Sequence, residues 1–189
     1  MTADPPDELH VRPEASSDEA VVRTVVAAAF GGRHVPGLLD GLRRSVAWLG
    51  LSLVAEVDGE VCGHVSLSRG WIDAPQRIID VLVLSPLSVR PDHQGRGVGS
   101  ALVEEALRAA AQRPEPLVFL EGSPRYYSRF GFVAGDSMGF TPPSVRIPPP
   151  AFQVFPLPSY QPWMRGALVY PDVFWRHDSV GLREEVARS

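Results

Sequence analysis

Residues 87–100 read LSVRPDHQGRGVGS, an apolar strand that runs through a polar turn into the start of an amphipathic helix. The first amides of a helix lack an acceptor within the helix, and the helix dipole adds about half a positive charge at that end. Gly95, Gly97 and Gly99 carry no Cβ, so an anion can come close to the bare backbone. Arg96 can add a charge-assisted hydrogen bond. The segment therefore predicts a binding site for a diphosphate group.

Several kinds of glycine-rich phosphate loop compete for this segment. A P-loop requires Lys-Ser or Lys-Thr after its last glycine, and no such pair follows here. A dinucleotide-binding fingerprint requires two residues between its second and third glycines, whereas these glycines are evenly spaced, although Glu115 or Glu121 could serve as its acidic residue. The pattern Gln/Arg-x-x-Gly-x-Gly/Ala fits without adjustment, with Gln94, Gly97 and Gly99 in its fixed positions. A plain tight turn would not require three glycines, each of which lowers helix propensity by about 1 kcal/mol.

A second segment, residues 121–132, reads EGSPRYYSRFGF. Its proline predicts the start of a short helix over residues 124–130. The two segments, in this order and at this spacing, resemble the GNAT family of N-acetyltransferases, whose second signature is aromatic-Tyr-x-x-x-Gly-Phe. The longer form of the second segment, together with VYPDVF at residues 169–174, is similar to the YhbS-like subgroup of predicted acetyltransferases. The likeness extends from about Leu9 to Trp175.

The resemblance implies an α+β fold, in which about six or seven mostly antiparallel strands form a mixed sheet flanked by about four helices. It also implies acetyl-CoA as the acetyl donor. The backbone of the strand before the polar turn would pair with the pantetheine amides, and the turn would hold the diphosphate. The residues that we assign to this cofactor site are Leu87, Ser88, Val89, Gln94, Gly95, Arg96, Gly97, Val98, Gly99, Ser100 and Tyr126.

The resemblance further implies direct attack of a primary amine on the thioester, without an acyl-enzyme. Tyr127 matches the family tyrosine that acts as general acid toward the leaving thiolate. Because a phenol is a weaker acid than a thiol, full proton transfer would be uphill by roughly 2 kcal/mol, so Tyr127 is better described as a hydrogen-bond donor. The alternative is a packed aromatic ring whose hydroxyl binds a backbone carbonyl.

The general base is less well defined by the sequence. Glu121 ends the strand that precedes the second segment, beside the expected thioester, so it is the first candidate. The other candidates are Glu56, Asp80, His64 and His93, and ordered water could replace all of them.

Two other functions remain open. A non-catalytic acyl-CoA-binding module would keep residues 94–99 without needing Tyr127, and an acyltransferase could use a longer acyl-CoA. The presence of the tyrosine favours an enzyme. The sequence does not identify the acceptor amine.

Hydrophobic periodicity and turn residues predict the remaining elements. Asp58-Gly59 joins two strand-like runs and predicts a β-hairpin. Ser16 and Glu19 have the spacing of a capping box and predict a helix that ends near Phe30. Further strands are expected at residues 8–12, 51–57, 60–67, 78–89, 117–120 and 152–157, and further helices at residues 38–48 and 97–112.

The length suits a single domain over residues 1–189, with residues 1–7 expected to be flexible. The segment 134–189 is rich in proline and aromatic residues. A disordered tail would be poor in aromatics, so we expect this segment to be loop-rich and packed on the same domain. It could shape the acceptor pocket or contribute a homodimer surface.

The net charge of −4 argues against a general affinity for nucleic acid or anionic membranes. Cys62 is the single cysteine and excludes an intrachain disulfide, and the scattered histidines predict no metal site. No stretch approaches the ~20 apolar residues of a membrane span, and the acidic N-terminus is unlike a signal peptide. We therefore expect a cytoplasmic protein.

Overall fold

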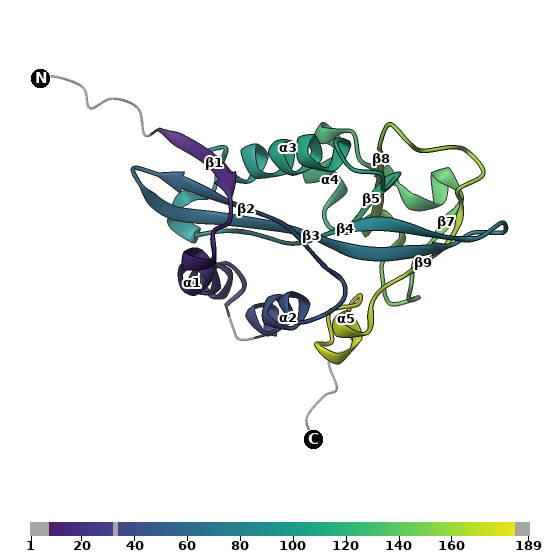
Figure 1. The fold of residues 1–189 in the computed structure, drawn as a ribbon, viewed down its shortest axis with the longest axis horizontal. Helices are drawn as coiled ribbons and strands as arrows, with labels where there is room; N and C mark the ends of the chain where they lie inside the picture. Colours follow the sequence, from purple (N-terminus) through teal and green to yellow (C-terminus); the bar gives the residue numbers. More distant parts are fainter. Residues whose placement is uncertain (1–7, 32–33, 184–189) are drawn as a thin grey trace, which may run out of the picture. The chain divides into compact units, whose positions relative to one another are not determined.

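The computed structural model describes residues 8–31 and 34–183 (Figure 1). Residues 1–7, for which we expect flexibility, lie outside this part of the chain. The strands are β1 (Leu9–Pro13), β2 (Trp48–Val57), β3 (Glu60–Asp73), β4 (Ile78–Val89), β5 (Leu117–Glu121), β6 (Val133–Ala134), β7 (Phe140–Thr141), β8 (Phe152–Pro156) and β9 (Gly166–Val169). The α-helices are α1 (Glu19–Phe30), α2 (His34–Arg43), α3 (Val98–Ala111), α4 (Pro124–Tyr127) and α5 (Asp172–Arg176). These elements confirm the predicted α+β class, and the strands exceed the expected number because the last third adds the short β6, β7 and β9.

Contacts divide the described chain into two compact units. Unit 1 holds the described residues up to Ser68 together with Leu84–Arg113, and unit 2 holds Arg69–Val83 and the described residues from Pro114 onward. Strands β3 and β4 each contribute residues to both units. The single domain over residues 1–189 stays a prediction.

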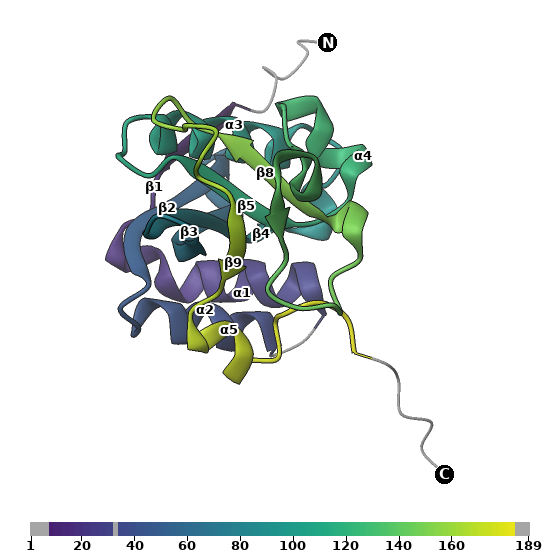
Figure 2. The same ribbon diagram turned by 90° about the vertical axis from the view of Figure 1, so that its right-hand side faces the viewer.

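In unit 1, β1, β2 and β3 pair antiparallel, with α1 and α2 on one face and α3 on the other (Figures 1 and 2). Asp58 and Gly59 have φ of 53° and 79° and join β2 to β3, which confirms the predicted hairpin. Buried valines of α1 pack against Leu39 of α2 and Val54 of β2. The apolar stripe of α1 thus covers the sheet on the side of α2.

Helix α3 packs closely against β3 at Gly63. A Cβ at Gly63 would lie 2.8 Å from Leu102 Cδ1 and 2.9 Å from Val98 Cγ1, so no larger residue fits without movement of the helix side chains. Both helix residues are buried. Because α3 starts at the end of the polar turn, this close packing fixes the position of the turn on the unit.

In unit 2, β5 pairs in parallel with β4 and antiparallel with β8 (Figure 2). Strand β8 also pairs with β6, while β9 pairs with β3 and with β7. The ring centroid of Phe119 in β5 lies 5.0 Å from that of Phe140 and 5.7 Å from that of Phe152. Aromatic rings of the last third therefore pack on β5. The strands of the last third stay short because prolines lack the N–H that a long ladder needs.

Several bounds differ from the predictions: β3 ends at Asp73 rather than at residue 67, and α4 ends at Tyr127, after which residues 128–130 form a 3-10 turn. Two predictions near the N-terminal helices are wrong in a further way. The helix expected over residues 38–48 is α2, which begins at His34 and ends at Arg43, and Trp48 begins β2 instead. Pro36 lies in the first turn of α2, where a missing N–H breaks no helical bond.

The second wrong prediction is the capping box expected at Ser16 and Glu19, because no side-chain hydrogen bond caps α1. A 3-10 turn, Ser16–Asp18, precedes α1, and the carboxylate of Asp18 accepts the Ala15 N–H at 2.8 Å. Arg12 donates to the same carboxylate, which lowers the pKa of Asp18. Asp18, rather than Ser16, therefore holds the turn that leads into α1.

Candidate active site

The polar turn of unit 1 connects the end of β4 to the start of α3. Arg90, just past β4, donates its N–H to the Cys62 carbonyl at 2.8 Å. The side-chain amide of Gln94 donates to the Val89 carbonyl at 3.0 Å. The first bond holds the start of the turn to β3, and the second holds Gln94 to the end of β4.

The end of β4 carries a polar side chain that its surroundings leave unsatisfied. Ser88 is 1 % exposed, and its hydroxyl has no hydrogen-bond partner among the residues described. Leu87 and Val89 on either side are half-buried. Buried polar groups normally find a partner, so the Ser88 hydroxyl is an exception at this strand end.

The backbone at the head of α3 is open. Gly95 and Gly97 have φ of 75° and 88°, in the left-handed region that favours glycine. A Cβ at either position would find no heavy atom within 4 Å. The first bond of α3 runs from the Ala101 N–H to the Gly97 carbonyl at 3.0 Å, so the earlier helical amides, such as that of Val98, precede the ladder. This geometry fits a diphosphate, which needs converging N–H groups and room for its oxygens.

Charges in the turn are arranged around one carboxylate. Arg90 Nη2 lies 2.7 Å from Asp92 Oδ2, and His93 Nδ1 lies 3.1 Å from Asp92 Oδ1. The hydrogen bond from Arg90 is the main cause that lowers the pKa of Asp92 to about 2. Arg96, in the same turn, is exposed.

In unit 2, the ring of Tyr127 is seated at the end of β5. A Cβ at Gly122 would lie 2.4 Å from Tyr127 Cε2, so only glycine leaves space for the ring there. Phe132 packs on the same ring with a centroid separation of 5.7 Å. Burial raises the pKa of Tyr127, so the phenol stays protonated. None of the hydrogen bonds between the described residues engages its hydroxyl, so the packed-ring alternative with a carbonyl partner is not what is observed.

Glu121, at the end of β5, is half-buried and held by the last third of the chain. Its Oε2 accepts the Gly181 N–H at 3.0 Å, and its carboxyl also hydrogen-bonds the Tyr170 hydroxyl. Burial is the largest influence and raises the pKa of Glu121, while these donors and the nearby charge of Arg146 act in the opposite direction. Such a carboxyl can take up a proton more readily than an ordinary surface glutamate.

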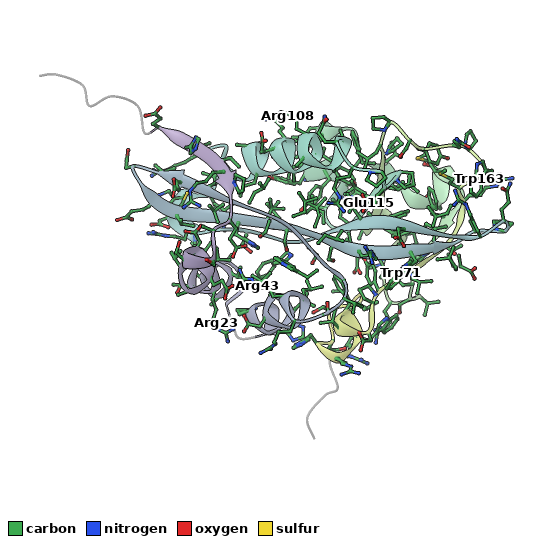
Figure 3. All side chains as sticks on the ribbon, in the orientation of Figure 1. Arg23, Arg43, Trp71, Arg108, Glu115 and Trp163 are labelled. Carbon is green, nitrogen blue, oxygen red and sulfur yellow. The ribbon has the colours of Figure 1, made fainter. Side chains whose placement is uncertain are left out.

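His64 is unsuited to contact a substrate. It is 0 % exposed, and its Nε2 lies 2.8 Å from Ser52 Oγ and 3.4 Å from Glu14 Oε2. Ser52 also donates to Glu14, which pairs with Arg43, labelled in Figure 3. Burial lowers the pKa of His64. This buried polar network is a structural feature of unit 1.

Glu56 and Asp80 are each engaged in an ion pair within their own unit. Glu56 forms a salt bridge of 2.5 Å with Arg12 on the β1–β2 pair of unit 1. Asp80 lies in unit 2 with Arg69 Nε at 3.7 Å from its Oδ2. It lines a pocket of about 500 Å³ whose other lining residues are Arg77, Ile78, Ile79, Pro114, Glu115, Pro116, Ser159 and Met164.

The assigned residues fall into two groups. The strand end and the turn, from Leu87 to Ser100, lie together in unit 1. Glu121, Tyr126 and Tyr127 lie together in unit 2, where the two tyrosine rings are 4.9 Å apart between centroids. Tyr126 also carries the guanidinium of Arg129 over its ring at 4.2 Å.

Sequence reasoning missed the residues that hold the second group. Gly122 belongs to the second sequence segment, but the structure is needed to show that its missing Cβ makes room for the Tyr127 ring. Tyr170 and Gly181 are separated from Glu121 by long stretches of chain, 60 residues in the case of Gly181. No local pattern could have found these contacts.

Within residues 8–31 and 34–183, no three His, Cys, Asp or Glu side chains are grouped as metal ligands. No helix in the same part of the chain is long and apolar enough to cross a membrane.

Comparisons with known proteins agree with these features. Residues 48–134 match the family model for the acetyltransferase (GNAT) domain. The chain is 34% identical over 127 residues to the uncharacterized N-acetyltransferase YjhQ of Escherichia coli strain K12, which covers 64% of this chain and 68% of that protein.

Two solved structures are similar over most of their length. One is the GNAT family N-acetyltransferase YhbS of Escherichia coli in complex with CoA, with a TM-score of 0.81, 26% identity, and coverage of 93% of this chain and 97% of that chain. The other is a GNAT family acetyltransferase of Brucella melitensis in complex with acetyl-CoA, with a TM-score of 0.71, 31% identity, and coverage of 89% and 99%. The two sequence segments, the fold and these relatives agree, and the chain belongs to the GNAT family of acetyltransferases.

Proposed function

We propose that this protein transfers the acetyl group of acetyl-CoA to a primary amine by direct attack. The observation that carries the proposal is the open backbone at the head of α3. Gly95 and Gly97 there have left-handed conformations, and a Cβ at either would have no neighbour within 4 Å. The CoA and acetyl-CoA held by the similar solved structures support the same donor for this chain.

The donor site would use mainly backbone groups. Amides of the first turn of α3 would bind the diphosphate, with Gly95 and Gly97 leaving room and Arg96 adding a charge-assisted bond. The strand end around Ser88 would pair with the amides of pantetheine, as an extended segment pairs with a free strand edge. Tyr126 is assigned to the same donor site.

The acceptor must lose a proton before it attacks. An amine similar to lysine arrives as an ammonium with a pKa near ~10. Glu121 would take this proton, because burial has raised its own pKa and made it a stronger base. The amine nitrogen then forms a bond to the acetyl carbon while the carbon–sulfur bond breaks, and the bonding electrons leave with the thiolate. The nitrogen releases its second proton to solvent water, which leaves the neutral amide.

Tyr127 would stabilise this thiolate by a hydrogen bond. Burial raises the pKa of Tyr127, so the phenol is an even weaker acid than in water and keeps its proton. A donor that is already in place when charge develops lowers the barrier without transferring a proton. The protonated phenol therefore suits the role of donor rather than that of full acid.

A thiol-release screen tests the proposal. The purified protein is incubated with acetyl-CoA and, in turn, with polyamines, aminoglycosides, amino acids and peptides with free N-termini. We expect amine-dependent CoA release with at least one class. Binding of acetyl-CoA by calorimetry with no release from any amine would instead support a non-catalytic module, and release only from longer acyl-CoA would change the donor.

A further inference from the structure

Residues 179–182, near the end of the described chain, are fixed onto unit 2 by several backbone contacts. The Leu182 N–H donates to the Arg146 carbonyl at 3.0 Å, and Arg146 Nη2 donates to the Val180 carbonyl at 2.9 Å. The side chain of Val180 is 1 % exposed. Because bonds run in both directions between this segment and Arg146, the segment is held in one place rather than resting on the surface.

Gly181 lies at the closest point of this contact. Its φ is 62°, and a Cβ there would lie 2.6 Å from the Arg146 carbonyl carbon. Both the backbone conformation and the space therefore require glycine. Because the backbone is held this closely, the Gly181 N–H points toward Glu121 Oε2, and the nitrogen lies 3.0 Å from that oxygen.

Tyr170 brings a second donor to the same carboxyl. Its side chain is buried, and its ring stacks on Phe174 at a centroid separation of 4.7 Å. The hydroxyl hydrogen-bonds Glu121. Since the ring is fixed by packing, the hydroxyl reaches the carboxyl without loss of much further conformational freedom.

We propose that Tyr170 and the backbone of Gly181 are positioning groups that orient the Glu121 carboxylate and keep it ionised as the base for the incoming ammonium. This inference rests on the proposed function, in which Glu121 accepts the proton. It assigns to the last third of the chain a part in the reaction, exerted through Glu121, that packing alone would not provide.

The chemistry supports this role over a purely structural one. A buried carboxyl tends to become neutral, and a neutral acid cannot accept a proton from an amine. Hydrogen bonds to the ionised form counteract that tendency, and Arg146 is the charged group that assists them. A carboxylate has about four lone-pair sites, so two donors leave acceptor capacity for the substrate.

The test compares Tyr170→Phe with wild type and with Tyr160→Phe, a matched loss of one hydroxyl elsewhere in unit 2. The first readout is the pH dependence of kcat/KM for the best amine. Loss of the Tyr170 donor makes the ionised form of Glu121 less stable, so the acid limb moves to higher pH. On that limb kcat/KM falls about tenfold, whereas Tyr160→Phe follows the wild-type curve.

A second readout does not depend on activity. The carboxyl carbon of Glu121, assigned by its disappearance in Glu121→Gln, is followed by ¹³C NMR during a pH titration. We expect it to titrate at higher pH in Tyr170→Phe than in wild type. Gly181→Ala, which displaces the N–H, changes the titration in the same direction.

The outcomes separate this inference from the function on which it rests. If Glu121→Gln abolishes the acid limb but Tyr170→Phe and Gly181→Ala leave both the limb and the NMR titration unchanged, the positioning role is wrong while the base stands. If Glu121→Gln retains the wild-type profile, Glu121 is not the base, and the positioning role is overturned with it. Absence of transfer to any amine would overturn the proposed function itself.

Discussion

At the scale of single residues, Tyr127 is the side chain whose hydroxyl matters most to the proposed chemistry. Its ring is fixed against Gly122 and Phe132, and burial keeps its hydroxyl protonated. A hydrogen bond to a charged group contributes about 1.5–3 kcal/mol, so we expect Tyr127→Phe to lower kcat by roughly tenfold to hundredfold. The affinity for acetyl-CoA should stay close to that of wild type.

Thiol release and calorimetry measure the two quantities separately. Tyr160→Phe serves as the control for the loss of a phenol hydroxyl in the same unit. Activity of Tyr127→Phe within about twofold of wild type would remove this residue from the mechanism.

His64 makes a second prediction at this scale, for stability rather than catalysis. Burial lowers the pKa of His64 from its ordinary value of 6.5, so the unfolded chain binds a proton that the folded protein resists. Stability therefore falls as the pH drops below about 6.5, by at most about 1.4 kcal/mol per pH unit for this one group. The lowered pKa of Glu14 adds a further loss only in more acidic solution, below its ordinary 4.5.

Urea unfolding midpoints between pH 7.5 and pH 5 measure this dependence. His64→Gln, which cannot titrate, should flatten it over that range, and the exposed His10→Gln should keep the wild-type slope. Equal slopes in all three proteins would show that His64 does not contribute.

At the scale of elements, the turn before α3 depends on backbone conformation. Gly97→Ala forces a side chain into a conformation with φ of 88°, at a cost of about 1–2 kcal/mol, and places its Cβ in the open space above the helix head. We expect the Kd for acetyl-CoA to rise at least about tenfold, because the added methyl group occupies space that the diphosphate needs.

Gly59→Ala is the matched control for Gly97→Ala. Gly59 lies in the same unit, has φ of 79° and also has no heavy atom within 4 Å of a Cβ, but it belongs to the β2–β3 hairpin. The two variants should lose similar stability, and only Gly97→Ala should lose affinity in calorimetry. Equal affinities would contradict a role for the turn.

The close packing of α3 on β3 at Gly63 gives a further prediction. Gly63→Ala places a methyl group 2.8 Å from Leu102 Cδ1, and overpacking of this kind costs about 1–3 kcal/mol. Because α3 carries the turn, we expect both a lower thermal midpoint and weaker acetyl-CoA binding. Gly70→Ala makes a comparable contact in unit 2, 2.9 Å from Val83 Cγ2, and should lower the midpoint alone. Identical affinities in the two variants would show that this packing does not position the turn.

At the scale of the whole molecule, the sequence predicts best what is local. The turn, the helix after it and the Asp58-Gly59 hairpin follow from glycine placement and hydrophobic period, and all are found. The bounds of α2 were harder to predict because Pro36 reads as a breaker, although a first helical turn tolerates it. The contacts of Glu121 with Tyr170 and Gly181 join distant parts of the chain, so no window of sequence contains them.

The buried network of Glu14, Ser52 and His64 was unpredictable for a related reason. Its members lie at the end of β1 and in two neighbouring strands, and only the strand register brings them together. The assigned site residues, the acceptor amine, the cytoplasmic location and a homodimer stay predictions.

The account depends most on recognition of a diphosphate by backbone amides at the head of α3. Calorimetric titration with CoA and with pantetheine, which has the same thiol arm without the diphosphate, tests this directly. We predict that CoA binds and that pantetheine binds at least about a hundredfold more weakly, since it forgoes the charge-assisted contacts at the turn. Equal binding of the two compounds, or no binding of CoA, would contradict the account.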